Sequence, residues 1–484
     1  MSLTGLTVNV VDILFVVNLI FALTVILFER RNPTATLTWV LALMFIPVAG
    51  FIMYLFIGQD LRKKRLFYLK EEEERNLYQL LQLQDENLHN HMLTFTNPRT
   101  AQYSDVIHLH LNSDQSLFTQ DNQVQIFHQG EELFACLLER VRKASKHIHL
   151  QSYIIRNDAL GRELVDILCA KAREGVQVRL LYDGMGCIRL PRKFFHPLRQ
   201  AGGKVAAFFP PILPYINLRI NYRNHRKICV IDGQEAFVGG FNVGSEYLGQ
   251  SQRFGFWRDT HLLVKGSSVL ALQVRFLLDW RYASGEDYWL NQESLVVDNT
   301  AGQTGIQIVT SGPDSKWTSI KHGYLKIINK AQDNVFIQSP YFVPDDTILE
   351  ALKIASLSGV DVRLMIPGKK DHPFVHWASL SFVGELLEAG AQVFIYSKGF
   401  LHSKVLVSDG FASTVGTANM DIRSFRLNFE VNAFIYDNEI GRSLEAAFEE
   451  DQRDCLQLTL EAYASRPIRT KIKEAFSRLL SPLL

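Results

Sequence analysis

The sequence predicts an α/β protein with two similar layered domains, preceded by a two-helix transmembrane hairpin. Short β-branched runs alternate with helical stretches of about 12 to 17 residues, and this alternation occurs twice along the chain. Two long apolar runs within the first sixty residues predict the hairpin. At 484 residues, the chain is too long for one hydrophobic core and has room for several units.

Composition and charge exclude several protein classes. Hydrophobic residues make up 47% and charged residues 21% of the chain, which excludes a disordered or fibrous protein. The net charge of +1 argues against nucleic acid as a partner, because proteins that bind phosphate backbones usually carry a clear basic excess. The five cysteines form no CxxC pair, so we expect reduced thiols that face the cytoplasm.

Residues 1–60 form the predicted hairpin, with spans at about 8–28 and 37–57. About 21 apolar residues cross a hydrocarbon core of roughly 30 Å. A cleaved signal peptide is the weaker alternative, because no basic residue precedes the first run, and a buried core helix is weaker still. The four basic residues at 62–65 outnumber Arg30 and Arg31 in the link, so both termini are expected in the cytoplasm.

Residues 61–120 separate the hairpin from the α/β part of the chain. Leucines at a rough helical spacing predict a polar helical stalk up to about residue 95. We expect an irregular linker over residues 96–120.

The remaining sequence is an internal repeat of one unit in two copies, and we divide it into domains 121–300 and 301–484. The polar stretch that begins at Asn299 marks the boundary. Similar segments occur in the same order in both halves. The matched pairs are 147–153 with 335–341, 175–181 with 359–365, and 201–205 with 389–393.

A motif of the form His-x-Lys-x4-Asp-x6-Gly-x2-Asn occurs once in each half. With 14 histidines in the chain, composition alone predicts roughly 0.15 matches to its first three positions. Two matches at equivalent points of a repeat are therefore not a coincidence. The histidine, lysine, aspartate and asparagine of the two copies are His225, Lys227, Asp232 and Asn242, and His402, Lys404, Asp409 and Asn419.

The spacing of this motif suits the binding of an anion. A histidine and a lysine two residues apart on a strand point to the same face, so both can reach one phosphate group. The asparagine, at the turn that follows, can supply an amide donor. Asp232 and Asp409 complete the two motifs and are predicted with them as catalytic residues. Their position five residues beyond the lysine, at the predicted strand end, nevertheless favours a structural role.

With these motifs the chain resembles the phospholipase D superfamily and, within it, the bacterial cardiolipin synthases. Such a resemblance implies two α-β-α layered domains that face each other over one active site, in a protein of the bacterial inner membrane with cytoplasmic catalytic domains. Ser403 departs from the expected pattern, as does Cys229, and neither occupies a motif position. Other segments that carry the resemblance are 32–39, 256–261, 339–344, 416–424, 428–432 and 480–484.

The resemblance also implies a reaction, in which two phosphatidylglycerol molecules give cardiolipin and glycerol. It makes His225 the nucleophile that forms a phosphatidyl-histidine and His402 the acid and base, although the symmetry of the sequence alone does not assign these roles. Lys227 and Lys404, with Asn242 and Asn419, would hold the phosphate oxygens.

Two further acids are candidates to orient the imidazoles: Asp259, 34 residues after His225, and Glu430, 28 residues after His402. A carboxylate on Nδ1 of a histidine fixes its tautomer. No metal and no other cofactor is expected, because the sequence has no carboxylate cluster or HExxH pattern.

Three alternative functions remain open at this point. A phospholipase D hydrolase would use the same intermediate with water as the acceptor. A nucleic-acid phosphodiesterase is weakened by the neutral charge, and a non-catalytic lipid-binding scaffold is disfavoured by two intact motifs. Tyr153 and Tyr341, at equivalent strand ends, either line the site or pack in the core, and a loop containing His372 and His376 is a further candidate for substrate contact.

Overall fold

The computed structural model describes residues 16–23, 33–46, 67, 71–210, 221–288, 302–479 and 481. The chain divides into two units, one of residues 1–63 with 211–222 and one of residues 64–210 with 223–484. In the first unit, residues 16–23 are helical and α2 spans Pro33–Phe45. None of the helices among the described residues combines the length and apolar character needed to cross a bilayer. Much of both predicted spans lies outside the described residues, so the hairpin is not confirmed.

The second unit contains both predicted α/β domains. Before the repeat come α4 (Glu71–His89), the 3-10 helix η1 (Pro98–Tyr103) and α5 (Ser104–Asp114). The prediction of an irregular linker over residues 96–120 is therefore wrong. Val106 and Ile107 are fully buried in the core of the second half, and this burial holds α5 in place.

The first half alternates strands with helices, as predicted. Its elements are β1 (Phe118–Phe127), α6 (Gly130–Lys143), β2 (His147–Ser152), α7 (Ala159–Arg173), β3 (Gln177–Asp183), α8 (His196–Gln200), β4 (Lys204–Phe208), β5 (Arg223–Asn224), β6 (Ile228–Ile231), β7 (Glu235–Gly239), η2 (Ser245–Leu248), β8 (Phe256–Arg258), β9 (His261–Lys265) and α9 (Ser268–Ser284).

The second half repeats this order, with two added two-residue strands inside it and further elements at its C-terminal end. Its elements are β10 (Thr304–Ser311), α10 (Ser319–Lys330), β11 (Asn334–Gln338), β12 (Phe342–Val343), α11 (Asp346–Leu357), β13 (Asp361–Pro367), α12 (Pro373–Glu388), β14 (Gln392–Tyr396), β15 (Gly399–Leu401), β16 (Val405–Ser408), β17 (Ala412–Gly416), β18 (Met420–Asp421), α13 (Ile422–Arg426), β19 (Asn428–Tyr436), α14 (Asn438–Gln452), β20 (Cys455–Leu458), α15 (Leu460–Ala464) and α16 (Ile468–Leu479).

Among the described residues, 16 strands from both halves join in one sheet, and the pairs β8–β15 and β12–β18 form two separate two-stranded sheets. Outward from the central antiparallel pair β1–β10, the order is β1-β9-β7-β6-β2-β3-β4 on one side and β10-β19-β17-β16-β11-β13-β14 on the other, where β20 adds an edge strand. Each of these seven strands of one half has its counterpart at the same place in the other, so the sequence repeat is also a structural repeat. The predicted boundary near residue 300 lies in residues 289–301, outside the described residues.

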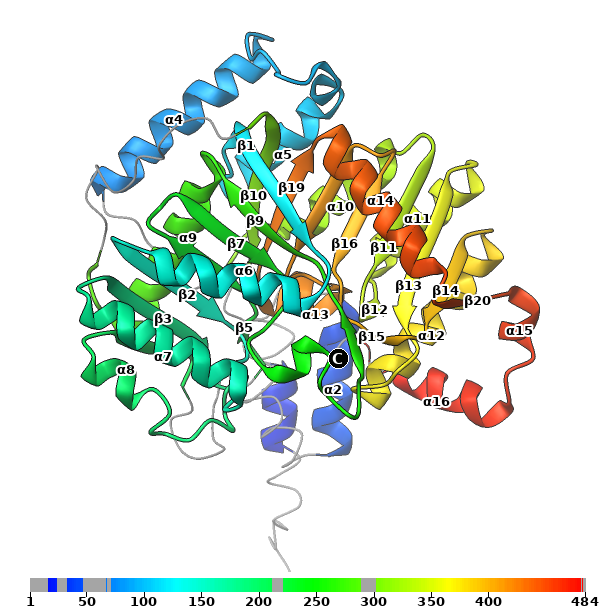
Figure 1. Cartoon of the computed structure of the whole chain (residues 1–484). Coiled ribbons are helices and arrows are strands. Elements are labelled where there is room, and N and C mark those ends of the chain that lie inside the picture. The colour runs from blue at the N-terminus through cyan, green and yellow to red at the C-terminus, as the bar shows by residue number, and fades with distance from the viewer. Residues whose placement is uncertain are drawn as a thin grey trace, which may run out of the picture. The chain divides into compact units, whose positions relative to one another are not determined.

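Helices cover both faces of each half (Figure 1). In the first half α6 and α7 lie on one face and α9 on the other, and α10 and α11 lie opposite α14 in the second. A third apolar cluster is shared by the halves and includes Val230 and Val238 of the first with Val407 and Val415 of the second. Because this shared core is buried, it fixes the two halves against each other.

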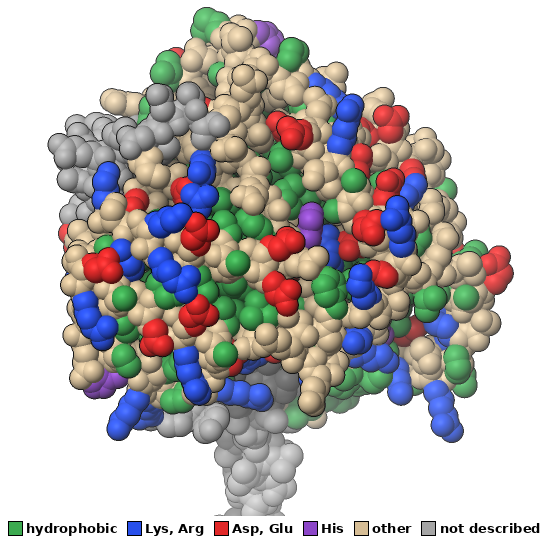
Figure 2. Space-filling model, viewed as in Figure 1, with side chains coloured by type: hydrophobic (Ala, Val, Ile, Leu, Met, Phe, Trp, Pro, Cys, Tyr) green, Lys and Arg blue, Asp and Glu red, His purple; other side chains and the backbone are tan. Residues whose placement is uncertain are grey.

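The charged side chains on the face shown in Figure 2 are of both signs. Lysine and arginine side chains alternate with aspartate and glutamate over the strands and helices of both halves. This surface agrees with the net charge of +1 and shows no continuous basic stripe of the kind that follows a nucleic-acid backbone.

Candidate active site

The first histidine of the motif is positioned by the second half of the chain. His225 directly follows the two-residue strand β5, which pairs in parallel with β19. Its backbone N–H donates to the carbonyl of Phe429 at 2.9 Å. Its ring nitrogen Nδ1 lies 2.9 and 3.1 Å from the two carboxylate oxygens of Glu430, the next residue of β19.

The second histidine has the converse arrangement. His402 directly follows β15, which pairs in parallel with β8 of the first half. Its backbone N–H donates to the carbonyl of Arg258 at 2.7 Å, and its Nδ1 lies 2.6 Å from Oδ2 of Asp259. Each histidine therefore contacts an acid from the other half. Asp259 and Glu430 do contact the imidazoles. Asp259, however, binds His402 and not His225, the motif histidine that precedes it, and Glu430 binds His225 and not His402.

The two carboxylates fix the tautomer of both rings. Asp259 and Glu430 are fully buried, and although burial favours their neutral forms, the adjacent cationic and imidazole groups hold both pKa values below the usual range. An ionised carboxylate only accepts hydrogen bonds, so the proton of each neutral imidazole resides on Nδ1. The lone pair of each ring is then on Nε2, the nitrogen that faces away from the acid.

Burial lowers the pKa of both histidines. The pKa of His225 falls below its ordinary value because of burial, with Glu430 opposing the change and Lys227 adding to it. The pKa of His402 falls to about 4, first through burial and then through the charge of Lys404, whose Nζ is 2.9 Å from Nδ1. Both imidazoles are therefore neutral near pH 7 when no anion is bound.

The two lysines are also buried, and their pKa values are low. Burial lowers the pKa of Lys227 to about 7 and that of Lys404 to about 8. The ammonium group of Lys227 donates to the carbonyl of His225 at 2.7 Å, and Lys404 does the same to His402. A buried cation of this kind gains most from an anionic ligand, since phosphate oxygens would restore the charged state.

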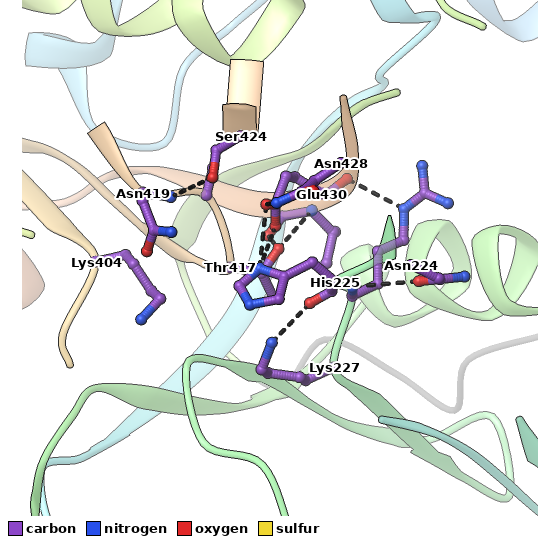
Figure 3. Close-up of polar contacts among 12 residues, drawn as sticks. Asn224, His225, Lys227, Lys404, Thr417, Asn419, Ser424, Asn428 and Glu430 are labelled. Carbon is purple, nitrogen blue, oxygen red and sulfur yellow. Dashed lines mark hydrogen bonds and ion pairs between the residues drawn. The ribbon is translucent and has the colours of Figure 1, made fainter. Parts of the chain in front are cut away.

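The two motifs face one shared site. The charge of Lys404 lowers the pKa of His225, and the charge of Lys227 lowers that of His402, so each lysine acts on the histidine of the other half. Figure 3 shows Lys404 and Asn419 from the second half on one side of His225, with Lys227 beside it. The histidines and lysines predicted from the two motifs thus meet in one place.

The two motif asparagines have different surroundings. The amide of Asn242 accepts from the backbone N–H of Ile154 and donates to the hydroxyl of Tyr247, both at 3.1 Å. The side-chain oxygen of Asn419 is buried and has no hydrogen-bond partner among the described residues. The predicted phosphate contact needs amide N–H groups, and at Asn242 one of the two already binds Tyr247.

The motif aspartates lie at the far ends of their strands. Asp232 accepts hydrogen bonds from the backbone N–H groups of Ser145, Lys146 and His147, at 2.7 to 2.9 Å. Asp409 accepts equivalent bonds from residues 332–334. These bonds hold the first residue of β2 and of β11, and they place both acids away from the histidines with which the motif groups them.

Comparison with known proteins agrees with this geometry. A family model described as cardiolipin synthase, PLD-like domain, matches residues 137–256 and 324–452. The chain is 50% identical to the major cardiolipin synthase of Bacillus subtilis over 98% of each chain, and 47% identical to a cardiolipin synthase of Oceanobacillus iheyensis over 99% of this chain and all of that one. The chain belongs to the cardiolipin synthase family.

Two further comparisons concern the fold and the N-terminal segment. A crystal structure of phosphatidylserine synthase from Haemophilus influenzae superposes with a TM-score of 0.61, at 15% identity, over 78% of this chain and all of that one. This likeness shows the fold alone. A family model described as phospholipase D-nuclease N-terminal matches residues 16–59.

Two buried ion pairs that support the histidine-binding acids were not predicted from the sequence. Arg226 contacts Asp279 of α9 at 2.8 and 2.9 Å, and its Nε donates to the carbonyl of Glu430 at 3.1 Å. Arg258 contacts Asp451 of α14 at 2.9 Å and donates to the carbonyl of Asp259. Each arginine thus holds the main chain of the acid that binds a histidine.

A signal for these ion pairs was present in the repeat. The matched segments 147–153 and 335–341 share a Gln-Ser pair, and the glutamines Gln151 and Gln338 each donate to the buried aspartate of their own half at 2.7 Å. A polar residue retained at a buried strand position in both copies indicates a polar partner on the covering helix. The partners themselves come from α9 and α14, where the sequence repeat is weak.

Other candidates fall near the site or outside it. The ring of Tyr153 packs edge-on against the ring of His225, with centroids 4.9 Å apart. The hydroxyl of Tyr341 donates to Asp371. The negative charge of Asp371 partly opposes the lowering of the pKa of Lys404 by burial. Both tyrosines therefore border the site, whereas His372 is exposed. Among the described residues, no group of histidine, cysteine and carboxylate side chains is placed to hold a metal ion.

Proposed function

We propose that this chain is a cardiolipin synthase that transfers a phosphatidyl group from one phosphatidylglycerol to the terminal hydroxyl of another, with release of glycerol. The observation that carries this proposal is the pair of Nδ1-anchored imidazoles, one from each half, beside two buried lysines in one site. The names of the cardiolipin synthases that match the whole chain support the choice of substrate.

In the first half-reaction, Nε2 of His225 attacks the phosphorus of the donor lipid. The bond between phosphorus and the glycerol oxygen breaks, and His402 donates its proton to that oxygen, so glycerol leaves as a neutral alcohol. His225 becomes cationic as the P–N bond forms, and the carboxylate of Glu430 on Nδ1 stabilises this charge.

His402 needs a proton for this step, although the pKa of its imidazole is about 4 without a ligand. The phosphodiester of the lipid carries a negative charge, and its arrival between the halves favours imidazolium at His402. The same charge favours the ammonium form of Lys227 and Lys404, which would hold the non-bridging oxygens. Binding of the anion therefore prepares both the acid and the oxygen contacts.

In the second half-reaction the terminal hydroxyl of another phosphatidylglycerol attacks the phosphatidyl-histidine. Neutral His402 accepts the hydroxyl proton, the new P–O bond forms, and the P–N bond to His225 breaks. The product is cardiolipin, and His402 again carries the proton needed for the next donor. Water in place of the lipid hydroxyl would give phosphatidic acid, which is the hydrolase alternative.

We assign Asp232 and Asp409 a structural role and treat Asp259 and Glu430 as positioning residues. The backbone hydrogen bonds of the motif aspartates at the strand starts support the first assignment. The contacts of the other two acids with Nδ1 support the second. Asn242 and Asn419 remain candidates for phosphate contact.

We also infer that residues 8–28 and 37–57 cross the bacterial inner membrane and that domains 121–300 and 301–484 lie in the cytoplasm. The two apolar runs, the basic residues at 62–65 and the family model over residues 16–59 support this topology. A C-terminal fusion to green fluorescent protein should fluoresce, and a C-terminal fusion to alkaline phosphatase should be inactive. The opposite pair of results would reverse the topology.

One assay tests the function. Purified protein in phosphatidylglycerol vesicles with a metal chelator should give cardiolipin and about equimolar free glycerol, as measured by mass spectrometry and an enzymatic glycerol assay. Phosphatidic acid as the main product would indicate a hydrolase. Absence of turnover, with lipid still bound, would indicate a scaffold.

A further inference from the structure

Helix α16 (Ile468–Leu479) packs on the protein with its polar side and exposes its apolar side. Glu474 and Ser477 are buried against α12, at 3% and 0% exposed. Four large hydrophobic residues lie on the opposite side of the helix, and we call them the apolar stripe. Their spacing of i, i+4, i+8 and i+11 places them on one face. The apolar stripe comprises Ile468 (69% exposed), Ile472 (61%), Phe476 (57%) and Leu479 (79%).

Two ion pairs and a cation–π contact accompany this orientation of the helix. Glu474 pairs with Arg466 at 2.7 Å, and Arg478 pairs with Glu385 of α12 while its guanidinium lies over the ring of Phe382. A rotation of α16 that buried the apolar stripe would break both pairs and expose Glu474. The exposure of the apolar stripe is therefore a feature of how the helix is attached.

Basic side chains flank the apolar stripe. Arg469, Lys471 and Lys473 are exposed on the two sides of it, and Glu474, buried and paired, is the one acid within α16. In Figure 2, hydrophobic and basic side chains are interspersed at the lower right, where Figure 1 places α15 and α16. An apolar stripe bordered by lysine and arginine fits the boundary between the headgroups and acyl chains of an anionic bilayer.

The apolar surface continues along α12 toward the active site. Phe374 is 49% exposed and packs edge-on against Trp377, with centroids 6.0 Å apart. The ammonium groups of Lys473 and Lys370 lie 4.9 and 5.5 Å from the centre of the Trp377 ring. Helix α12 begins two residues after Asp371, which binds Tyr341 at the border of the site.

We propose that the apolar stripe of α16, together with Phe374 and Trp377, is a docking surface for an anionic lipid bilayer. Phe476 and Ile472 enter the acyl-chain boundary, and Arg469, Lys471 and Lys473 contact lipid phosphates. None of these residues belongs to the predicted hairpin. It rests on the proposed function only in that phosphatidylglycerol would be both the docked lipid and the substrate, which would reach the site along α12.

The first test places a photoreactive benzoylphenylalanine at position 476 of the full chain in vesicles of equimolar phosphatidylglycerol and phosphatidylcholine. Irradiation should give a lipid adduct on the peptide that contains residue 476, and high salt or pure phosphatidylcholine should lower its yield. The matched control is position 357 on α11, where Leu357 is 72% exposed, and it should give no lipid adduct. A dimer crosslinked through position 476 would show that a second copy covers the stripe and would overturn the proposal, as would absence of any adduct.

The second test separates docking from catalysis. The double variant I472E/F476E should raise the KM for phosphatidylglycerol in vesicles by roughly tenfold or more. Its turnover of a short-chain, monomeric phosphatidylglycerol should equal that of the unmodified protein, and L357E should be normal in both assays. An unchanged KM in vesicles would refute the docking surface. Inactivity of the unmodified protein on both substrates would instead refute the proposed function.

Discussion

Nδ1 of His225 lies 2.9 Å from a carboxylate oxygen of Glu430, a residue 205 positions farther along the chain. The equivalent bond in the other direction joins His402 to Asp259, 143 positions earlier. Each half of the repeat thus supplies an imidazole to the site and the acid that orients the imidazole of its partner half. Neither half contains both members of one of these histidine–acid pairs, so both pairs need the two halves together.

Replacement of Glu430 by glutamine should lower kcat by roughly a thousandfold, because the amide does not fix the Nδ1 tautomer or stabilise a cationic His225. Asp259→Asn should have a similar effect through His402. The measurement is cardiolipin formation under saturating lipid, with circular dichroism to verify folding. Glu388→Gln, at an exposed position of α12, is the matched control and should be fully active. Normal activity of Glu430→Gln would remove the positioning role.

The value of kcat/KM should decrease as the pH rises above about 7, because the pKa of Lys227 is about 7 and that of Lys404 about 8 before lipid binds. Both ammonium groups are charged below these values and lose their charge above them, so the phosphodiester binds less well. On the acid side, the lowered pKa of His225 places its loss of nucleophilicity below pH 6.5. Lys227→Arg should move the alkaline limb to higher pH, since a guanidinium stays charged. An identical alkaline limb in Lys227→Arg would exclude Lys227 as its source.

Asp279→Asn should destabilise the catalytic unit by about 3–5 kcal/mol, because Arg226 and Arg275 would keep a buried charge without its carboxylate. Thermal unfolding in detergent, followed by circular dichroism, measures the change. The comparison variant is Asp361→Asn, whose ion pair with Arg363 is partly exposed and contributes at most about 1 kcal/mol. Equal effects of the two variants would contradict the importance of the buried pair.

Asp232→Ala should lower the free energy of unfolding by roughly 2 kcal/mol. The kcat of the protein that remains folded should change little. The carboxylate binds three backbone N–H groups at the start of β2, and its backbone has a φ of 54°, which alanine tolerates less well than aspartate or asparagine. Asp232→Asn should therefore recover part of the loss. A thousandfold loss of kcat in a folded Asp232→Ala protein would return this residue to the catalytic group.

The α/β class, the repeat and both histidine–lysine pairs could be predicted from the sequence, because the alternation of strands and helices and the fixed motif spacing are local patterns along the chain. The crossing of the acids was not visible there. It depends on the strands β5, of two residues, and β15, of three, which are too short to predict and which pair with strands of the other half. Helix α5 was missed for a different reason: its buried face contacts β10 and α10, about two hundred residues away, and its own composition is polar.

The most direct test of a site shared by both halves is to follow a phosphatidyl-enzyme intermediate in His402→Ala and His225→Ala, with phosphatidylglycerol labelled at phosphorus. Wild-type protein denatured in detergent at neutral pH, where the P–N bond of a phosphohistidine is stable, should carry the label on the peptide with His225, and His225→Ala should carry none. In His402→Ala the label should appear on His225 more slowly, because the acid that protonates the leaving glycerol is missing. It should then decay far more slowly than in the wild type, because the base from the second half is also missing. Label retained in His225→Ala would contradict the assignment of the nucleophile, and a normal lifetime in His402→Ala would contradict one site built from two halves.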